Sequence, residues 1–300
     1  MKSLLEFEYS PPSGMRNVQS LAVGTKGPGL EFTGSLGILK GLGEIPGSLG
    51  SLAFHKGMEE SKQITLDDDK LRIGASVTAA QLVGSREIRE RFRCIAMGAE
   101  TIGPPVVQNT ATIGANLLWA EPTAALPPAL IAYGAKIVLS TDWGKRKMSM
   151  EDFFKGPGQT DAGQDEILTE IVIENPPAHS GGGYVHSGKA KTLGISPVHV
   201  AAFLTLESPG ATVRSARIVL GAVTRVPMRA YSAEWTVTGK MPGDEVFHLA
   251  GEVASNYIRF NNTDTSNPEY QKEMIKIFTA CALSMAFEEA KTPNKMIDRH

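Results

Sequence analysis

The chain has 300 residues, of which 42% are hydrophobic and 21% charged, and its formal net charge is −2. This composition excludes a disordered chain and suits about two globular domains. It also lacks the basic excess of nucleic-acid-binding proteins. The longest apolar stretch, from Leu117 to Leu139, contains charges and three prolines, which argues against a membrane span. The opening residues are too acidic for a signal peptide, so we expect a cytoplasmic protein.

The two cysteines, Cys94 and Cys281, stand far apart and have no clustered Cys or His neighbours. A structural zinc or an iron–sulfur cluster needs about four ligands. We therefore expect no metal site in this chain and interpret both cysteines as small apolar packing residues.

Glycines concentrate between Gly24 and Gly57, where the chain first offers a ligand-binding pattern. The apolar run from Leu21 leads directly into the glycine-rich turn Gly24–Gly27. Such a turn presents successive backbone N–H groups to phosphate oxygens. The spacing matches neither the P-loop nor the dinucleotide-binding glycine pattern, so an ordinary turn remains the alternative.

Regular secondary structure is predicted from Leu71 onward. Alternating apolar residues predict strands over 71–76, 137–140, 167–173, 198–206 and 213–220. Helical spacing predicts helices over 78–92, 149–154, 244–258 and 268–290, the first opened by a capping box of Thr78 and Gln81. Strands precede helices in each half, which indicates two α+β units.

Two further expectations concern the second half of the chain. Asn175–Gly183, with two prolines and three glycines, is interpreted as a linker. In the last helix, the apolar spacing predicts one buried face, made of Met274, Phe278, Cys281 and Met285.

The second ligand-binding candidate follows Gln108. Thr110 and Thr112 offer hydroxyls, Gly114 permits close backbone approach, and Asn116 both donates and accepts hydrogen bonds. A ligand or a tightly hydrogen-bonded turn would satisfy these groups equally well. Trp119, His199 and His248 lie in apolar patterns, and we interpret them as core or surface residues.

An ordered series of segments resembles one family, the FAD-binding medium subunits of molybdenum hydroxylases. The series comprises Thr112–Asn116, Ala120–Pro127, Glu151–Pro157, Asp165–Ile171 and Ala216–Ala230. The similarity extends from about Phe7 to Ala290, nearly the whole chain.

The resemblance implies an α+β fold in two domains. Residues 1–177 would form an FAD-binding domain of the vanillyl-alcohol oxidase-like fold, with two α/β subdomains over about 1–57 and 58–177. Residues 178–300 would form a C-terminal α+β domain.

The resemblance also assigns the FAD-binding residues. The pyrophosphate would lie against the loop Ala22, Val23, Gly24, Thr25, Lys26 and Gly27 and against the hydroxyl of Thr112. Gly114 and Asn116 would shape the second wall, Ile102 would lie beside the cofactor, and the Leu168 backbone would contact the isoalloxazine. His186 and Ser196 would lie near the flavin ring.

The sequence departs from the family pattern at several positions. Ala115 replaces a glycine, Ala125 an aspartate and His186 a lysine that neutralises charge on the flavin. The stretch between Pro12 and Leu21 is about ten residues shorter than usual. The change at Ala115 is a small one if its φ is negative.

The function implied by the resemblance is electron transfer. FAD would receive electrons from [2Fe–2S] clusters of a small subunit, reduced in turn by a large molybdopterin subunit, and pass them to NAD, a quinone or another acceptor. Two such heterotrimers can form a dimer. The alternatives are a structural subunit that has lost FAD, favoured by Ala125, His186 and the short N-terminal region, and a stand-alone flavin oxidase.

Overall fold

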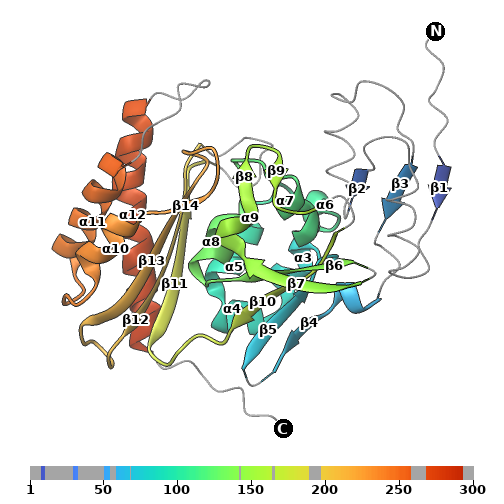
Figure 1. Cartoon of the computed structure of the whole chain (residues 1–300). Helices are drawn as coiled ribbons and strands as arrows, with labels where there is room; N and C mark the ends of the chain where they lie inside the picture. The colour runs from blue at the N-terminus through green and yellow to red at the C-terminus, as the bar shows by residue number, and fades with distance from the viewer. Residues whose placement is uncertain are drawn as a thin grey trace.

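The computed structural model describes residues 8–10, 30–32, 51–54, 59–67, 69–141, 143–163, 166–188, 197–257 and 268–292. The fold is α+β, as predicted: a small parallel sheet precedes two larger antiparallel sheets, each with its own helices (Figure 1). The small sheet has the order β1-β3-β2, from β1 (Glu8–Ser10), β2 (Leu30–Phe32) and β3 (Ser51–Phe54).

The five-stranded sheet has the order β4-β5-β10-β6-β7, with every neighbouring pair antiparallel. Its strands are β4 (Ile64–Leu66), β5 (Lys70–Gly74), β6 (Lys136–Thr141), β7 (Gly144–Ser149) and β10 (Ile167–Glu174). The 3₁₀ helix η2 (Glu59–Lys62) precedes it, and β8 (Phe154–Gly156) and β9 (Gln159–Thr160) form a separate hairpin. The edge strand β7 carries exposed basic side chains, which discourage pairing with another strand.

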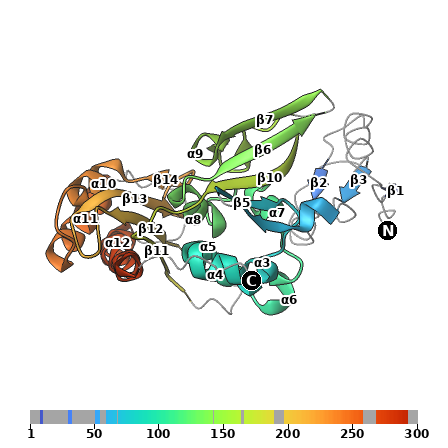
Figure 2. The same ribbon diagram turned by 90° about the horizontal axis from the view of Figure 1, so that it is seen from below.

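Seven short helices accompany this sheet within the described ranges, and α3 to α6 lie below it in Figure 2. They are α3 (Ala79–Gly84), α4 (Arg86–Arg91), α5 (Arg93–Glu100), α6 (Pro105–Gln108), α7 (Ile113–Leu118), α8 (Leu126–Ala132) and α9 (Met150–Phe153).

The capping box of Thr78 and Gln81 is confirmed, but the single helix over 78–92 is wrong. The chain breaks at Ser85, which adopts an extended conformation (φ −67°, ψ 128°), and its side chain accepts a hydrogen bond from the Ile88 N–H. A side chain that caps a new helix competes with continuation of the old one.

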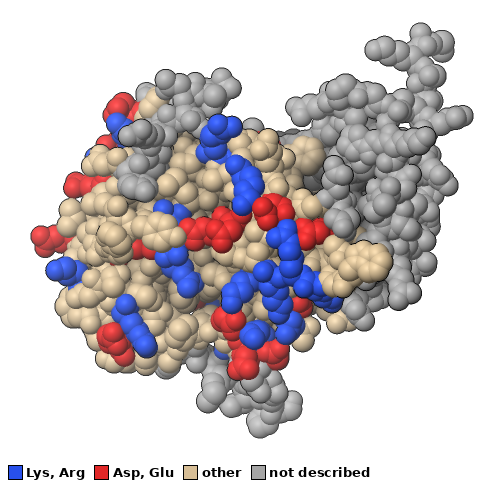
Figure 3. Space-filling view, in the orientation of Figure 1, with Lys and Arg blue, Asp and Glu red and all other residues tan. Residues whose placement is uncertain are grey.

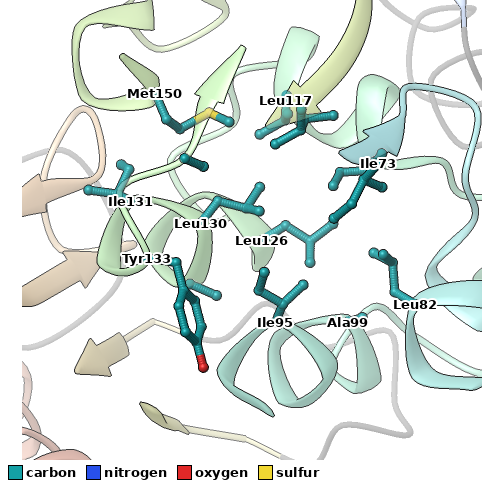
Figure 4. Close-up of a cluster of buried hydrophobic side chains, with 14 of the residues drawn as sticks. Ile73, Leu82, Ile95, Ala99, Leu117, Leu126, Leu130, Ile131, Tyr133 and Met150 are labelled. Carbon is teal, nitrogen blue, oxygen red and sulfur yellow. The ribbon is translucent and has the colours of Figure 1, made fainter. Parts of the chain in front are cut away.

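Large aliphatic side chains fill the core between this sheet and its helices (Figure 4). Leu126 lies centrally, with Ile73, Leu82 and Ile95 around it, and all four are fully buried. Burying one such side chain contributes about 1.5–3 kcal/mol.

The second large sheet has the order β11-β12-β13-β14 and is antiparallel throughout. Its strands are β11 (Ser180–His186), β12 (His199–Leu206), β13 (Val213–Gly221) and β14 (Met228–Arg229). Helices α10 (Tyr231–Val237), α11 (Asp244–Tyr257) and α12 (Pro268–Lys291) cover its outer face (Figure 1). Helices α5 and α8 pack on its other face, so they lie between the two sheets.

Two sequence predictions in this part are wrong, and both errors arise at one contact. The stretch interpreted as a linker ends in strand β11, and the buried face of α12 is not the predicted one. A Cβ at Gly181 or Gly183 would overlap the carbonyl of Ala286 or Ala282 on α12. The glycines are therefore strand residues that allow the helix to approach the sheet backbone closely.

The true buried face of α12 is made largely of small side chains. It consists of Gln271, Ile275, Thr279, Ala280, Ala282, Leu283, Ala286 and Ala290. Met274, Phe278 and Met285 are half-buried at its side. Cys281 is exposed, so only Cys94 is the buried packing residue that we expected of both.

The surface agrees with the balanced composition. Blue and red side chains alternate across the centre of the face shown in Figure 3. Part of this charge is paired, for example where Arg146 binds Asp161 and Glu166 at the edge of the five-stranded sheet. In the part of the chain that the structure describes, no helix is long and apolar enough to span a membrane.

Candidate functional site

The second predicted wall of the cofactor site is the start of helix α7. Thr112 is its N-cap: its backbone is extended (φ −92°, ψ 156°) and its hydroxyl oxygen accepts a hydrogen bond from the Ala115 N–H at 3.2 Å. A β-bridge joins Thr112 to Thr78, the N-cap of α3, so two helix starts meet here. Ala115 lies within the helix and is not among the residues of positive φ, so its replacement of glycine costs little backbone strain.

The backbone amides at this helix start already have partners. The N–H of Ile113 donates to the Val77 carbonyl, and the N–H of Gly114 donates to the Ala75 carbonyl, both at 2.8 Å. These bonds anchor α7 to the loop that follows β5. A cofactor contact at this wall must therefore come from side chains rather than from these two N–H groups.

Leu168 lies on β10, directly behind this wall. The pairing of β10 with β6 shifts register between Leu168 and Glu170, which leaves Thr169 out of the ladder. The carbonyl of Thr169 instead accepts a hydrogen bond from the Ala75 N–H at 3.0 Å. Such bulges change the direction of the backbone and are common next to functional sites. This one ties β10 to Ala75, whose carbonyl also accepts the hydrogen bond from the Gly114 N–H. The Leu168 side chain is buried.

Asn116 connects α7 to α8. Its Oδ1 accepts a hydrogen bond from the Leu126 N–H at 3.4 Å, which orients the side-chain amide. Among the described residues, no acceptor is present for its Nδ2 group, so that group is available to donate. Trp119, one turn later, is half-buried and donates from Nε1 to Glu121 at 3.2 Å.

His186 on β11 and His199 on β12 lie directly opposite each other in the ladder, with ring centroids 6.2 Å apart. His186 is half-buried, and burial lowers its pKa below the usual 6.5. His199 is 2% exposed, and burial together with the neighbouring His186 lowers its pKa to about 3. Both rings are therefore neutral at pH 7, so His186 does not supply the positive charge expected of the lysine it replaces.

Tyr184, which the sequence reasoning missed, links these histidines to the segment Ala120–Ala125 between α7 and α8. Its hydroxyl lies 2.8 Å from the carbonyl oxygen of Ala125 and 2.8 Å from Nδ1 of His199. We call the contact between β11 and the segment Ala120–Ala125 the seam. The alternation of β11 would have pointed Tyr184 toward it, but the three preceding glycines favoured a linker.

Ile102 follows α5 and is 8% exposed. The end of α5 contacts the same seam, because a Cβ at Gly98 would lie 3.3 Å from the Ala125 carbonyl oxygen and 3.5 Å from the Tyr184 ring. Asn116 reaches this seam through the Leu126 N–H and His186 through the neighbouring Tyr184 ring, whereas Ile102 follows Gly98 by four residues. Thr112 and Gly114 lie at the adjoining start of α7, and Leu168 lies on β10. The loop 22–27 and Ser196 lie outside the described residues.

Neither acid–base pairs nor metal ligands define this region. Within the described ranges, no group of three or more His, Cys, Asp or Glu side chains could hold a metal ion. Cys94 is fully buried, and burial raises the pKa of its thiol well above the usual range.

Two family models match the chain in succession. Residues 49–176 match the FAD-binding domain in molybdopterin dehydrogenase, and residues 184–286 match the C-terminal domain of the CO dehydrogenase flavoprotein.

Curated relatives agree with these matches. The chain is 29% identical to the nicotinate dehydrogenase FAD-subunit of Eubacterium barkeri over 61% of its own length and 63% of that protein. It is 27% identical to the glyceraldehyde dehydrogenase medium chain of Sulfolobus acidocaldarius, over 69% of the chain and 72% of that protein.

Solved structures share the fold. Carbon monoxide dehydrogenase from Hydrogenophaga pseudoflava superposes with a TM-score of 0.87 at 24% identity, covering 96% of this chain and 99% of the other. Quinoline 2-oxidoreductase from Pseudomonas putida 86 superposes with a TM-score of 0.85 at 22% identity, with the same coverage.

Proposed function

Because the chain belongs to the FAD-binding medium subunits of the molybdenum hydroxylases, a family of oxidoreductases, we propose that it is the electron-transfer flavoprotein of such a complex. FAD supplies the redox chemistry when bound. A small [2Fe–2S] subunit and a large molybdopterin subunit deliver electrons, and NAD, a quinone or another carrier receives them. A cytoplasmic location is part of the same proposal.

The observation that carries this proposal is that α7, α5 and β11 meet at Ala125 and Leu126: Asn116 accepts from the Leu126 N–H, Gly98 packs against the Ala125 carbonyl, and Tyr184 donates to it. Asn116 offers Nδ2 donors and His186 a neutral ring beside this contact, and the apolar Ile102 follows the end of α5. Hydrogen-bond donors beside an apolar wall suit the polar and aromatic parts of a flavin nucleotide.

Exposed apolar side chains support the proposal of partner subunits. Trp143 is 94% exposed, Trp235 77% and Val106 76%. Large exposed aromatic groups are typical of surfaces that bind other proteins. In size-exclusion chromatography of native extract, we expect this chain to elute together with one smaller and one larger partner subunit. A free monomer with full turnover would favour the stand-alone oxidase.

Flavin content tests cofactor binding directly. Acid treatment of the native complex should release about one FAD per chain, and FMN should not replace it. A colourless intact complex would favour the structural subunit, a second candidate supported by the neutral His186 and by Ala125 in place of an aspartate.

The variant Asn116→Asp tests the wall itself. Asp keeps the oxygen that accepts from the Leu126 N–H but removes the Nδ2 donors and adds a negative charge. We expect FAD affinity to fall at least tenfold, or about 1.4 kcal/mol, measured by flavin fluorescence titration. The matched control is Asn109→Asp, the same change at an exposed position after α6. Equal affinity in both variants would remove Asn116 from the site.

A further inference from the structure

The segment from Ala120 to Ala125, between α7 and α8, is held by three hydrogen bonds from distant parts of the chain. Three of its carbonyls accept hydrogen bonds from residues far along the sequence: Ala120 from the Gly158 N–H at 3.0 Å, Pro122 from the Ala222 N–H at 2.9 Å, and Ala125 from the Tyr184 hydroxyl at 2.8 Å. Two of these donors come from the C-terminal sheet and its connection: Tyr184 lies on β11, and Ala222 directly follows β13.

Backbone strain marks both sides of this contact. Ala120 has φ +44° and Ala222 has φ +66°, and only one other described non-glycine residue, His179, has a positive φ. A left-handed conformation is unfavourable for alanine and persists only where surrounding contacts enforce it. The two strained residues lie on opposite sides of the seam, which indicates that the fit between segment and sheet is enforced from both sides.

The hydrogen bonds of Tyr184 fix the tautomer of His199. The Ala125 carbonyl can only accept, so the single hydroxyl proton of Tyr184 is donated to it. The hydroxyl oxygen must then accept from His199, which places a proton on Nδ1. Neutral His199 then carries a bare Nε2, which is buried and meets no hydrogen-bond geometry with the described residues, while the Thr123 backbone lies close enough to the ring to oppose part of the fall in its pKa.

We propose that Tyr184 and His199 are positioning residues of the cofactor site: His199 Nδ1–H orients the Tyr184 hydroxyl, which holds the Ala125 carbonyl and thereby fixes the segment that follows Asn116. The C-terminal domain thus aligns the second wall of the site rather than only extending the surface. This inference rests on the proposed function, since the wall is a cofactor wall only if FAD binds there.

The neighbouring contacts explain how this effect reaches the wall. Ala125 immediately precedes Leu126, whose N–H orients the Asn116 amide. Gly98 packs against both the Ala125 carbonyl and the Tyr184 ring, and the chain reaches Ile102 four residues later. Releasing the Ala125 carbonyl therefore loosens Asn116 first and the end of α5 second.

The decisive variant is Tyr184→Phe in the full chain within its native complex. It removes one oxygen and leaves the ring, and we expect FAD to bind about tenfold more weakly, measured by flavin fluorescence titration. His199→Leu should weaken binding similarly. His199→Asn keeps an N–H donor near the Nδ1 position and should restore affinity to within about threefold of the wild type.

The matched control is Ile218→Val, in the same sheet but on the opposite face, which packs against α10, α11 and α12. It reduces stability without touching the seam. If Tyr184→Phe weakens FAD binding no more than this control at equal thermal stability, the proposal is overturned.

Two measurements separate this proposal from the proposed function. Hydrogen exchange by mass spectrometry should show faster exchange of the amides of residues 116–126 in Tyr184→Phe and His199→Leu than in Ile218→Val, whether or not FAD is bound. Nitrogen NMR of the wild type should show His199 protonated at Nδ1 and bare at Nε2. A wild type without flavin defeats the proposed function alone, whereas unchanged exchange or the opposite tautomer defeats the positioning role.

Discussion

The five-stranded sheet and the four-stranded sheet hold their helices in different ways. Behind the first sheet, fully buried side chains such as Leu126, Leu130 and Ile95 fill the space between helix and strand (Figure 4). Behind the second, Gly181 and Gly183 of β11 lie directly against the backbone of α12. The first interface depends on side-chain volume and the contact of β11 with α12 on its absence, although β12 and β13 pack larger side chains against the same group of helices.

The difference has a consequence for mutational tolerance. A core of large side chains loses stability when volume is removed, because a cavity remains. A contact between backbones loses stability when volume is added, because neither backbone can move without disturbing its own hydrogen bonds. The two interfaces should therefore respond to opposite kinds of substitution.

The largest expected effect is that of Gly183→Val. Its side chain would overlap the Ala282 carbonyl and approach Met285, so α12 must move away from β11. We expect a loss of about 4 kcal/mol or more in the free energy of unfolding, together with loss of soluble full-length chain. Denaturant unfolding monitored by circular dichroism gives the measurement.

Gly84→Ala serves as the control for this substitution. Gly84 ends α3, has no positive φ, and a Cβ there meets no atom within 4 Å. We expect it to be neutral or to stabilise slightly, because alanine favours the helix. Equal stability of the Gly183 and Gly84 variants would contradict the close backbone contact.

Removal of volume from the first interface should have the next largest effect. Leu126→Ala leaves a cavity among Ile73, Leu82 and Ile95, and we expect a loss of about 3 kcal/mol. Leu249→Ala, at a position 50% exposed on α11, should change the free energy of unfolding by less than about 0.5 kcal/mol. A loss at Leu126 as small as that control would show that this core collapses around the missing side chain.

The same contrast explains what the sequence could predict. Strands β6, β10, β12 and β13 and helices α11 and α12 follow from apolar periodicity, because large side chains create that pattern, whereas α10 was not predicted. Strand β11 gives no such signal, since its glycines have no side chains to alternate. The face of α12 that meets it is made of alanines, so the larger Met274, Phe278 and Met285 misdirected the prediction.

The candidate site was predictable to a similar extent. Thr112, Asn116, Ile102 and His186 were assigned through the resemblance and stay predictions, and the structure places Asn116 and His186 on either side of the contact between Ala125 and Tyr184. Tyr184 could not be found because its role depends on a carbonyl 59 residues away, that of Ala125. A hydrogen bond to a backbone oxygen leaves no mark on the identity of the residue that accepts it.

The smallest effect expected concerns Glu289, a carboxylate half-buried where α12 meets β11. Its Oε2 accepts from the Gly182 N–H at 2.9 Å, and burial raises its pKa above the usual 4.5, while Arg93 partly opposes that rise. A carboxyl group whose folded pKa is raised favours folding below its unfolded pKa, and this contribution is lost as the pH rises through the folded pKa.

Glu289→Gln keeps an oxygen acceptor but cannot ionise, so its melting temperature should fall less than that of the wild type between pH 4.5 and 8. Glu288→Gln, at an exposed neighbouring position, should follow the wild-type profile. Parallel profiles for all three proteins would mean that the close contact between α12 and β11 leaves Glu289 hydrated, and that the strand and helix backbones are further apart than the glycines of β11 indicate.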